Sequence, residues 1–541
     1  MADSQQVRHF RQILIWPLQL MPLDESGVLG QQWRLMAAAA DSPWQLRASE
    51  FEPGAFQERH YREFITFLPY VQRFLYGEGE TEANDVASYG KSPLHVFRRH
   101  DVKSARLTFR DGAEIDLAIA HIDLYFFFDI DVVILAFEVM GDDLPLPRVQ
   151  DILFRFGRSF PAQWDEDGGP ASCLARVAWR DAGGRVLATS DYDDRDAYLD
   201  HLASYRSPRL ARHWAWLLEP MVPHHSDVAG GVRYRQLEYH RMPLMAYLAL
   251  DEPFSLSEAD FYRIGMVTRP DDDEALPGRL VRDFIEQNCY DRYWSPEQGV
   301  PSASTRMMCN GQALVVVGDR RHRFFCDAQT GVLGQFRHQQ FLLALIAHFH
   351  KAALLTFSDR MAVALARLNV ADVHSVRLFK RDIRIQLEVF LRFTQRYWFS
   401  EISNQAVTAR LFEMLRRHLG TAELYREVQD SVRSMSQYLE SDDLRRQADT
   451  IVKLTVVTIL SLVGTTVTGF LGMNVFDLAD ASPLAKVGYF AIVLAPTLML
   501  TLYTLMKARP LAEFLERMAD QRAGWRGRLA AFIHIWRRRR G

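Results

Sequence analysis

The chain has 541 residues and a formal net charge of −3 at pH 7. This length is more than one compact domain usually holds, and the near balance of charge gives no general argument for a nucleic-acid partner. The four cysteines are scattered and form no Cys-x-x-Cys pair, which argues against a zinc cage or a disulfide framework and fits a reducing compartment.

The first 22 residues lack the pattern of a secretory signal. Their apolar run, Ile13–Leu20, is short, and no small-residue cleavage site follows it. We therefore expect the N-terminus to stay in the cytosol.

The first large block, residues 1–340, has the pattern of a mixed α and β cytosolic domain. Hairpins are predicted over Arg106–Leu117 and Arg176–Thr189, and a third pair of strands over Ala313–Val317 and Arg323–Cys326. The segment 165–170 is predicted to be a loop or a subdomain boundary because it is rich in glycine and carboxylates.

Other parts of this block are predicted to be buried strands and helices. The segment His121–Met140 is strongly apolar but contains four carboxylates, so we interpret it as strands of a soluble sheet rather than a membrane span. Helices are expected over Ala259–Met266 and Pro277–Tyr290.

From Phe341 the composition becomes helical, and residues 341–450 are predicted to form a helical stalk region. Helices are expected over Phe341–Leu368, Asp372–Ser403 and Asn404–Leu419, the last of them ending at Gly420. A new helix begins at Thr421 and meets no proline before Leu471. A helix of about 50 residues would be about 75 Å long.

Two uncharged apolar runs lie near the C-terminus, at Leu454–Leu471 and Val487–Met506. Each has about the 20 residues that an α-helix needs to cross a bilayer. Two transmembrane helices are therefore predicted, at about 451–473 and 487–507, within a membrane region that spans residues 451–509.

Charge predicts the orientation of these spans. The tail after the second span, residues 510–541, is rich in arginine, whereas the connection Val475–Lys486 carries two aspartates and one lysine. By the positive-inside rule the tail faces the cytosol and the connection faces outside. We expect a multi-pass protein of the inner (plasma) membrane with both termini in the cytoplasm. The arginines of the tail are expected to act mainly as a lipid anchor.

The tripeptide Gly472-Met473-Asn474 closes the first apolar run, after a long helix and before a short outer loop, a final span and a basic tail. In this context it resembles the CorA-type family of divalent metal cation transporters, also called the two-span GxN or GMN family. The resemblance covers Thr421–Arg509 and extends back to Phe341. The block before it is longer than the cytosolic domain usual in that family.

The resemblance implies a funnel-shaped homopentamer: an α+β cytosolic domain, a long stalk helix and two transmembrane helices, the first of which lines the pore. Gly472, Met473 and Asn474 would form the selectivity motif, with Asn474 as a ring of carboxamides that binds a hydrated ion through its water. The alternative for Asn474 is a helix C-cap at the membrane interface.

The resemblance also implies which side of the first span faces the pore. Thr465 and Thr458 would supply oxygens, and three aliphatic side chains would form apolar constrictions that gate by dewetting. The alternative is that the threonines bond to carbonyls of their own helix and the leucines face lipid or a neighbouring helix. The expected pore-lining residues are Gly469, Thr465, Leu462, Thr458, Leu454 and Ile451.

The two spans contain no Asp, Glu or His. A proton-coupled transporter usually needs an ionisable relay within the membrane, so passive flow is favoured. The chain also lacks a GxxxxGK[ST] phosphate loop and a GxSxG nucleophile motif. We expect no enzyme activity and no cofactor apart from the transported cation.

Members of the resembled family bind regulatory Mg²⁺ at cytosolic carboxylates between subunits. Clusters here could do the same, although solvated acidic surfaces are the favoured interpretation. They are Asp191, Asp193, Asp194 and Asp196, the run Asp271–Glu274, and Asp442 with Asp443. His348 and His350, near His338, and the pair His224 and His225 have poor spacing for a metal site and are expected to be packing or surface residues.

The sequence therefore predicts a channel for divalent cations, with Mg²⁺ first and Co²⁺ or Ni²⁺ as further cargo. The expected partners are membrane lipid, four further copies of the chain and the cations, and no nucleic acid. Two alternatives stay open: a relative that transports Zn²⁺, and a membrane-anchored cytosolic sensor or scaffold without transport.

Overall fold

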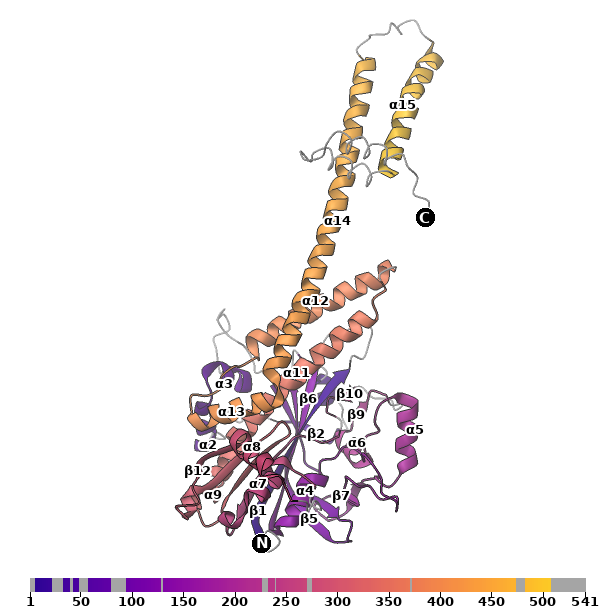
Figure 1. The fold of residues 1–541 in the computed structure, drawn as a ribbon. Helices are drawn as coiled ribbons and strands as arrows, with labels where there is room; N and C mark the ends of the chain where they lie inside the picture. Colours follow the sequence, from indigo (N-terminus) through magenta and orange to yellow (C-terminus); the bar gives the residue numbers. More distant parts are fainter. Residues whose placement is uncertain are drawn as a thin grey trace. The chain divides into compact units, whose positions relative to one another are not determined.

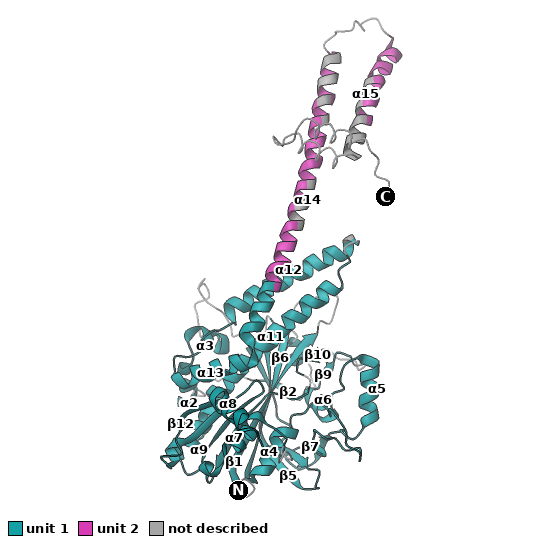
Figure 2. Cartoon of the chain, viewed as in Figure 1, with its two compact units in different colours: residues 1–430 teal, residues 431–541 magenta. Residues whose placement is uncertain are grey.

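The computed structural model describes residues 5–21, 33–38, 42–47, 57–78, 94–127, 130–225, 232–238, 240–269, 275–369, 372–472 and 482–506. The chain divides into two compact units, residues 1–430 and 431–541 (Figure 2). Helices α11 (Phe341–Ala366), α12 (Val373–Arg396) and α13 (Ala406–Leu419), which fall in the region 341–450, lie in the first unit.

The first unit is built on one mixed sheet, whose described strands follow the order β12-β13-β14-β11-β1-β6-β5-β4-β7-β8 (Figure 1). The short strands β2, β3, β9 and β10 join it at the sides of this path. The strand bounds are β1 Gln6–Met21, β2 Trp44–Leu46, β3 Leu94–Arg99, β4 Ser104–Thr108, β5 Glu114–Phe127, β6 Val132–Pro145, β7 Arg176–Arg180, β8 Val186–Thr189, β9 Met221–Pro223, β10 Val232–Gln236, β11 Leu244–Leu250, β12 Cys289–Trp294, β13 Ser304–Cys309 and β14 Ala313–Asp319.

The N-terminal strand β1 lies at the centre of this sheet. It pairs with β6 in antiparallel register from Gln6 opposite Pro145 to Gln19 opposite Val132. Its other edge is shared, because β11 pairs with its first half and β10 with its second half. Among the described strands, only β11 with β14 and β9 with β10 run parallel.

Two of the three predicted strand pairs are confirmed. Strands β4 and β5 pair across a turn in which Gly112 has a φ of +81°, and β7 and β8 pair across a turn in which Gly184 has a φ of +78°. Positive φ values at these turns favour glycine. The interpretation of His121–Met140 as buried strands is also confirmed, since β5 and β6 hold all described residues of this segment except Ile130 and Asp131.

The third predicted pair is wrong in one member. Ala313–Val317 lies in β14, but Arg323–Cys326 forms the short helix α9. Both edges of β14 are already occupied by β11 and β13, and the chain turns sharply after β14 through a bond from the His322 amide to the Asp319 carbonyl. Phe325 then stacks on Tyr247 with ring centroids 4.6 Å apart, which holds α9 against the sheet.

Helices cover both faces of the sheet. On one face, α4 (Leu146–Arg155) and α6 (Arg212–Leu218) pack over a cluster of aromatic side chains. Trp214 of α6 lies edge-on to Trp16 of β1 at 6.2 Å and to Phe137 of β6 at 6.0 Å. Alternation along the strands sends these aromatic residues to the same face.

On the other face lies α11 (Phe341–Ala366), which contacts β1 and β6 as well as α12 and α13 (Figure 1). Phe349 of α11 stacks on Phe127 of β5 with centroids 3.9 Å apart. The helical run Val332–Ala366 is the one described segment long and apolar enough to cross a membrane, but 78% of its most apolar window is buried inside the unit. Burial of this kind is typical of a core helix.

The helices predicted over Ala259–Met266, Pro277–Tyr290 and the segments from Phe341 to Leu419 agree with the observed α7, α8, α11, α12 and α13 to within a few residues at each end, except that α12 ends at Arg396 rather than Ser403. Gly420 ends α13 with a φ of +64°, the left-handed conformation that glycine adopts readily. Helix α14 then runs from Thr421 to Gly472 without a break. The helix bounds are α1 Trp33–Ala38, α2 Glu58–Thr66, α3 Pro69–Tyr76, α5 Arg195–Tyr205, α7 Glu258–Met266, α8 Gly278–Asn288, α10 Val332–Gln335, the π-helical turn η4 Phe336–Gln340, α12 Val373–Arg396, α13 Ala406–Leu419 and α15 Pro483–Met506.

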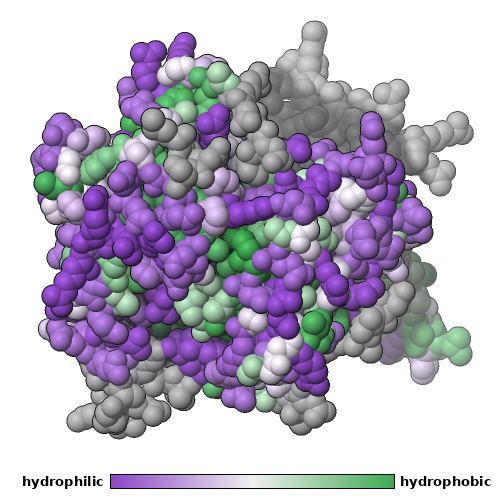
Figure 3. All heavy atoms as spheres, turned by 90° about the horizontal axis from the view of Figure 1, so that it is seen from below, coloured by the Kyte–Doolittle hydropathy of each residue, from purple (hydrophilic) through white to green (hydrophobic). Residues whose placement is uncertain are grey.

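The surface of the first unit seen in Figure 3 is mostly hydrophilic, with hydrophobic side chains in small separate patches. Such a surface is typical of a domain that faces water.

Candidate functional site

Helix α14 begins inside the first unit and is anchored there by aromatic packing. The ring of Tyr425 stacks on Trp398 with centroids 4.5 Å apart and on Phe390 at 5.9 Å. Val428 is 1% exposed. The first two turns of α14 therefore belong to the core of the first unit, and its later part belongs to the second unit.

The six predicted pore-lining residues and Gly472 lie on one side of α14. All of them fall within the helix, so its geometry relates their directions. At about 100° per residue, the positions from 451 to 472 fall within an arc of about 80°. The face so defined, the α14 face, consists of Ile451, Leu454, Thr458, Leu462, Thr465, Gly469 and Gly472.

The α14 face is exposed in the single chain. Ile451 is 63% exposed, Leu454 67% and Leu462 68%. Large aliphatic side chains in this number at a water-exposed surface are unfavourable. We therefore expect a partner of some kind, protein or lipid, beside this part of the helix.

The threonines of the α14 face bond to their own helix. The hydroxyl of Thr458 donates to the carbonyl of Leu454 at 2.8 Å, and that of Thr465 donates to the carbonyl of Ser461 at 2.8 Å. Each hydroxyl therefore uses its one proton in a hydrogen bond within the helix. Its oxygen keeps lone pairs that can accept hydrogen bonds from outside the helix. This geometry matches the alternative considered for the threonines, and it leaves their acceptor function intact.

Helix α15 has the same exposed apolar character. Leu484 is 87% exposed, Ile492 67% and Met499 75%. Within the described residues, the second unit contains shorter apolar helical stretches, at Thr450–Ile459 and Pro483–Pro496. Pro496 lies inside α15, a position that removes one backbone hydrogen bond and favours a local bend.

Part of the predicted selectivity motif falls outside the described residues. Gly472 is the last residue of α14, whereas Met473 and Asn474 lie beyond it. The basic tail after Met506 also lies outside the described residues. The geometry of the α14 face therefore describes the helix up to Gly472 and does not include Met473 and Asn474.

Two aspartates of the first acidic cluster that could sense metal, Asp191 and Asp194, have other roles in the structure. Asp191 is 5% exposed, and its carboxylate accepts from the Tyr198 hydroxyl at 3.1 Å and forms an ion pair with Arg209 at 2.9 Å. Asp194 caps α5. The run Asp271–Glu274 and the side chains of Asp442 and Asp443 are outside the described residues.

Among the residues that the structure describes, no three His, Cys, Asp or Glu side chains are grouped so that they could hold a metal ion. His348 and His350 are packed inside the first unit, where burial lowers the pKa of each to about 3. The Nε2 atom of His350 lies 2.6 Å from the carbonyl oxygen of Tyr397. Both histidines are therefore packing residues, as expected.

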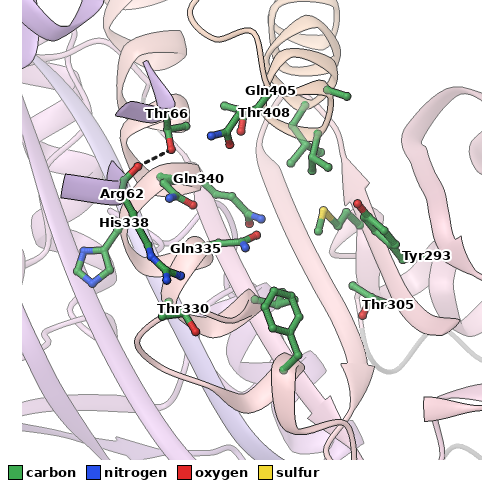
Figure 4. Close-up of a pocket in the computed structure, with 18 of the residues that line it drawn as sticks. Arg62, Thr66, Tyr293, Thr305, Thr330, Gln335, His338, Gln340, Gln405 and Thr408 are labelled. Atoms are coloured by element: carbon green, nitrogen blue, oxygen red, sulfur yellow. Dashed lines mark hydrogen bonds between the residues drawn. The ribbon is translucent and has the colours of Figure 1, made fainter. Parts of the chain in front are cut away.

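The first unit also contains a cavity of about 650 Å³ that the sequence analysis did not predict. Its walls come from α2, the β12–β13 pair, η4 and the start of α13 (Figure 4). These elements are far apart in the sequence, so no local motif marks the cavity. One local signal was present, namely the glutamine-rich run Gln335–Gln340 just before the apolar core helix.

The model of a protein family described as CorA-like Mg²⁺ transporter protein matches residues 347–507. The matched segment begins in α11 and ends just after α15, so it includes the α14 face. Comparison of the chain with curated proteins and with solved structures gives no match. Over residues 347–507, which are less than half of the chain, the protein is therefore similar to a family of Mg²⁺ transporters.

Proposed function

We propose that the chain is a passive channel for hydrated divalent cations, with Mg²⁺ as its main cargo and Co²⁺ or Ni²⁺ as further ones. In this proposal five copies surround one pore in the inner (plasma) membrane, and α14 of each copy lines it. One observation carries the proposal: the α14 face unites seven uncharged residues, two of them hydroxyl-bearing, on one exposed side of a continuous helix.

The chemistry of this face suits an ion that keeps its water. Mg²⁺ gives up its hydration shell reluctantly. Water molecules around a cation point their hydrogens outward, so a pore wall must offer acceptors. The oxygens of Thr458 and Thr465 do so, because their own protons are donated within the helix. In the proposal Asn474 forms a further acceptor ring at the outer mouth.

The aliphatic residues would act as the gate. Ile451, Leu454 and Leu462 present large side chains on the α14 face. Five copies of such a side chain around an axis would form a narrow apolar ring, which a hydrated ion cannot pass until the ring widens or wets. The glycines at 469 and 472 would leave the pore wider toward the outer mouth.

The proposed membrane spans are 451–473 and 487–507, with both termini in the cytoplasm. The exposed apolar side chains of α14 and α15 support this placement, because a lipid environment removes the cost of exposing them to water. The spans hold no Asp, Glu or His, which favours passive flow. A membrane potential of 100 mV favours entry of a divalent cation by about 4.6 kcal/mol.

Flux into liposomes tests this function. Purified full-length protein is reconstituted into liposomes, and uptake of Mg²⁺, Co²⁺ and Zn²⁺ is measured with and without a membrane potential that is negative inside the vesicles. We expect Mg²⁺ uptake that grows with the potential and that Asn474→Ala strongly alters. Wild-type vesicles that take up no more metal than empty ones would refute the channel and favour the membrane-anchored sensor.

The same assay decides between metals, since uptake of Zn²⁺ in preference to Mg²⁺ would indicate the zinc-transporting alternative. Native mass measurement in detergent tests the assembly separately. A mass of five chains is expected, and a stable dimer would contradict the proposed pore.

A further inference from the structure

The cavity in the first unit has the size and chemistry of a ligand site. Its volume of about 650 Å³ falls in the range of small-molecule pockets, roughly 300 to 1,000 Å³. In Figure 4 the side chain of Arg62 descends one wall and Tyr293 stands on the opposite wall, with Gln335 and Gln340 between them.

The charges around the cavity have one sign. Three arginines line it, Arg59 and Arg62 from α2 and Arg292 from β12, and no carboxylate is found among its described lining residues. Arg62 pairs with the exposed Glu58 at 2.7 Å. Arg59 and Arg292 have no ion pair with any residue in the described part of the chain, and Arg59 Nε is buried there without a hydrogen-bond acceptor. The cavity therefore favours an anion with more than one negative charge.

The buried carboxamide of Gln340 is a second, independent observation, because it calls for a hydrogen-bond donor on the ligand. Gln340 is 5% exposed, and within the described structure its Oε1 atom accepts no hydrogen bond. A buried acceptor without a donor is destabilising, so a ligand that supplies a hydroxyl or N–H group would relieve this cost. Threonines and further glutamines along the wall, among them Thr330 and Gln335, extend the hydrogen-bonding surface.

The wall that carries Gln340 is held rigidly. Gln340 ends the π-helical turn η4, and Arg337 of the same turn is bonded to the buried Glu138 at 2.9 Å. Gly334, just before the turn, approaches the carbonyl of Ala328 so closely that a Cβ would lie 2.9 Å from it. Single π turns of this kind are rare and occur frequently at functional sites.

We infer that this cavity binds a phosphorylated small molecule that carries at least two negative charges and hydroxyl groups, such as a nucleoside diphosphate or a sugar bisphosphate. The arginines hold the phosphates, and Gln340 accepts from a hydroxyl. None of the lining residues belongs to the α14 face, so the transporter would have a separate metabolite site within the first unit.

Equilibrium binding to the full-length protein in detergent tests the inference. Isothermal titration in metal-free buffer is carried out with ADP, fructose 1,6-bisphosphate, pyrophosphate and adenosine. We expect at least one of the first two to bind more tightly than pyrophosphate, and adenosine not to bind. Arg59→Gln and Arg62→Gln should each weaken binding about tenfold or more, as expected for loss of a charged hydrogen bond.

Two further variants make the test specific. Arg279→Gln removes a positive charge from α8 outside the cavity, at a side chain that is 88% exposed, and should change binding less than twofold. Gln340→Met should weaken the binding of the hydroxyl-bearing ligand but not the binding of pyrophosphate. The inference is overturned if no phosphorylated probe binds at millimolar concentration, or if Arg59→Gln and Arg279→Gln have equal effects. Neither result bears on ion flux, which is measured without these ligands.

Discussion

Arg337, on the π-helical turn η4, donates hydrogen bonds to both carboxylate oxygens of Glu138, at 2.9 and 3.2 Å. Glu138 lies in β6 and is fully buried. Arg11 of β1 and His121 of β5 reach the same carboxylate, each at 3.0 Å. One buried carboxylate thus joins three neighbouring strands to the turn that forms a wall of the cavity.

The same network continues through His121. Its Nδ1 atom lies 3.3 Å from the carboxylate of Asp123, which Arg98 binds with two hydrogen bonds of 2.7 Å. Burial alone would raise the pKa of Asp123, but the bonds from Arg98 and His121 hold it at about 2. Burial would lower the pKa of His121, yet its two carboxylate partners raise it above the ordinary 6.5.

Replacement of Glu138 by Gln should strongly destabilise the first unit. Arg11, His121 and Arg337 would then be left beside an uncharged amide, and breaking a buried ion pair in this way costs about 3 to 5 kcal/mol. Urea unfolding at pH 7, followed by tryptophan fluorescence, measures the loss, because 9 of the 11 tryptophans lie in residues 1–430. Glu114→Gln, at a side chain that is 50% exposed, should cost less than about 1 kcal/mol.

His121 should stabilise the fold at low rather than high pH. Because the pKa of His121 is raised in the folded state, its contribution is complete below pH 6.5 and is lost as the pH rises through the folded value. The stability difference between wild type and His121→Gln should therefore shrink from pH 6 to pH 9. A difference that stays constant or grows over this range would contradict the network.

Three other histidines should have the opposite effect. Burial lowers the pKa values of His213, His348 and His350 to about 3. Below pH 6.5 the unfolded chain binds protons at these residues and the folded chain does not, so stability present above pH 6.5 is lost as the pH falls. The three together give a slope of up to about 4 kcal/mol per pH unit. His348→Leu should reduce the slope measured between pH 6 and 5 by up to about 1.4 kcal/mol per pH unit, and an unchanged slope would show that His348 does not contribute.

Within the proposed pore, Thr458→Val should reduce Mg²⁺ flux several-fold. The change removes an acceptor oxygen from the α14 face but keeps the shape of the side chain. Thr468→Val is the matched control: its hydroxyl makes the same bond, to the carbonyl of Gly464 at 2.9 Å, but it points about 60° away from Thr465 around the helix. Equal loss of flux in both variants would indicate an effect on the helix rather than on a pore wall.

Local patterns predicted much of the secondary structure. Gly420 and the absence of proline after Thr421 marked the ends of α13 and the start of α14, because helix termination and continuation depend on neighbouring residues. The Asp-Gly turn of the β4–β5 hairpin could equally be predicted from the sequence. Arg323–Cys326 was wrongly assigned to a strand, because its short apolar run is compatible with either structure until the edges of β14 are known to be occupied.

The buried charges show the limit of local patterns. Asp123 and Glu138 were seen as interruptions in an apolar segment, and their burial in strands was expected. Their partners Arg98, Arg337 and Arg11 come from other elements, as much as 199 residues away in the chain. Pairing over such distances is decided by strand order and packing, which single-sequence patterns do not encode.

The sequence by itself determined that this chain has a long C-terminal helix, two uncharged apolar segments and a Gly-Met-Asn tripeptide between them, because length, charge and periodicity are local properties. The match to the CorA-like family over residues 347–507 rests on the same part of the chain. Only the tertiary structure decided that the long apolar helix α11 is buried in the first unit and that arginines and glutamines from four distant elements enclose a cavity. Both outcomes depend on which surfaces are covered by the rest of the chain, and that is known only once the sheet has assembled.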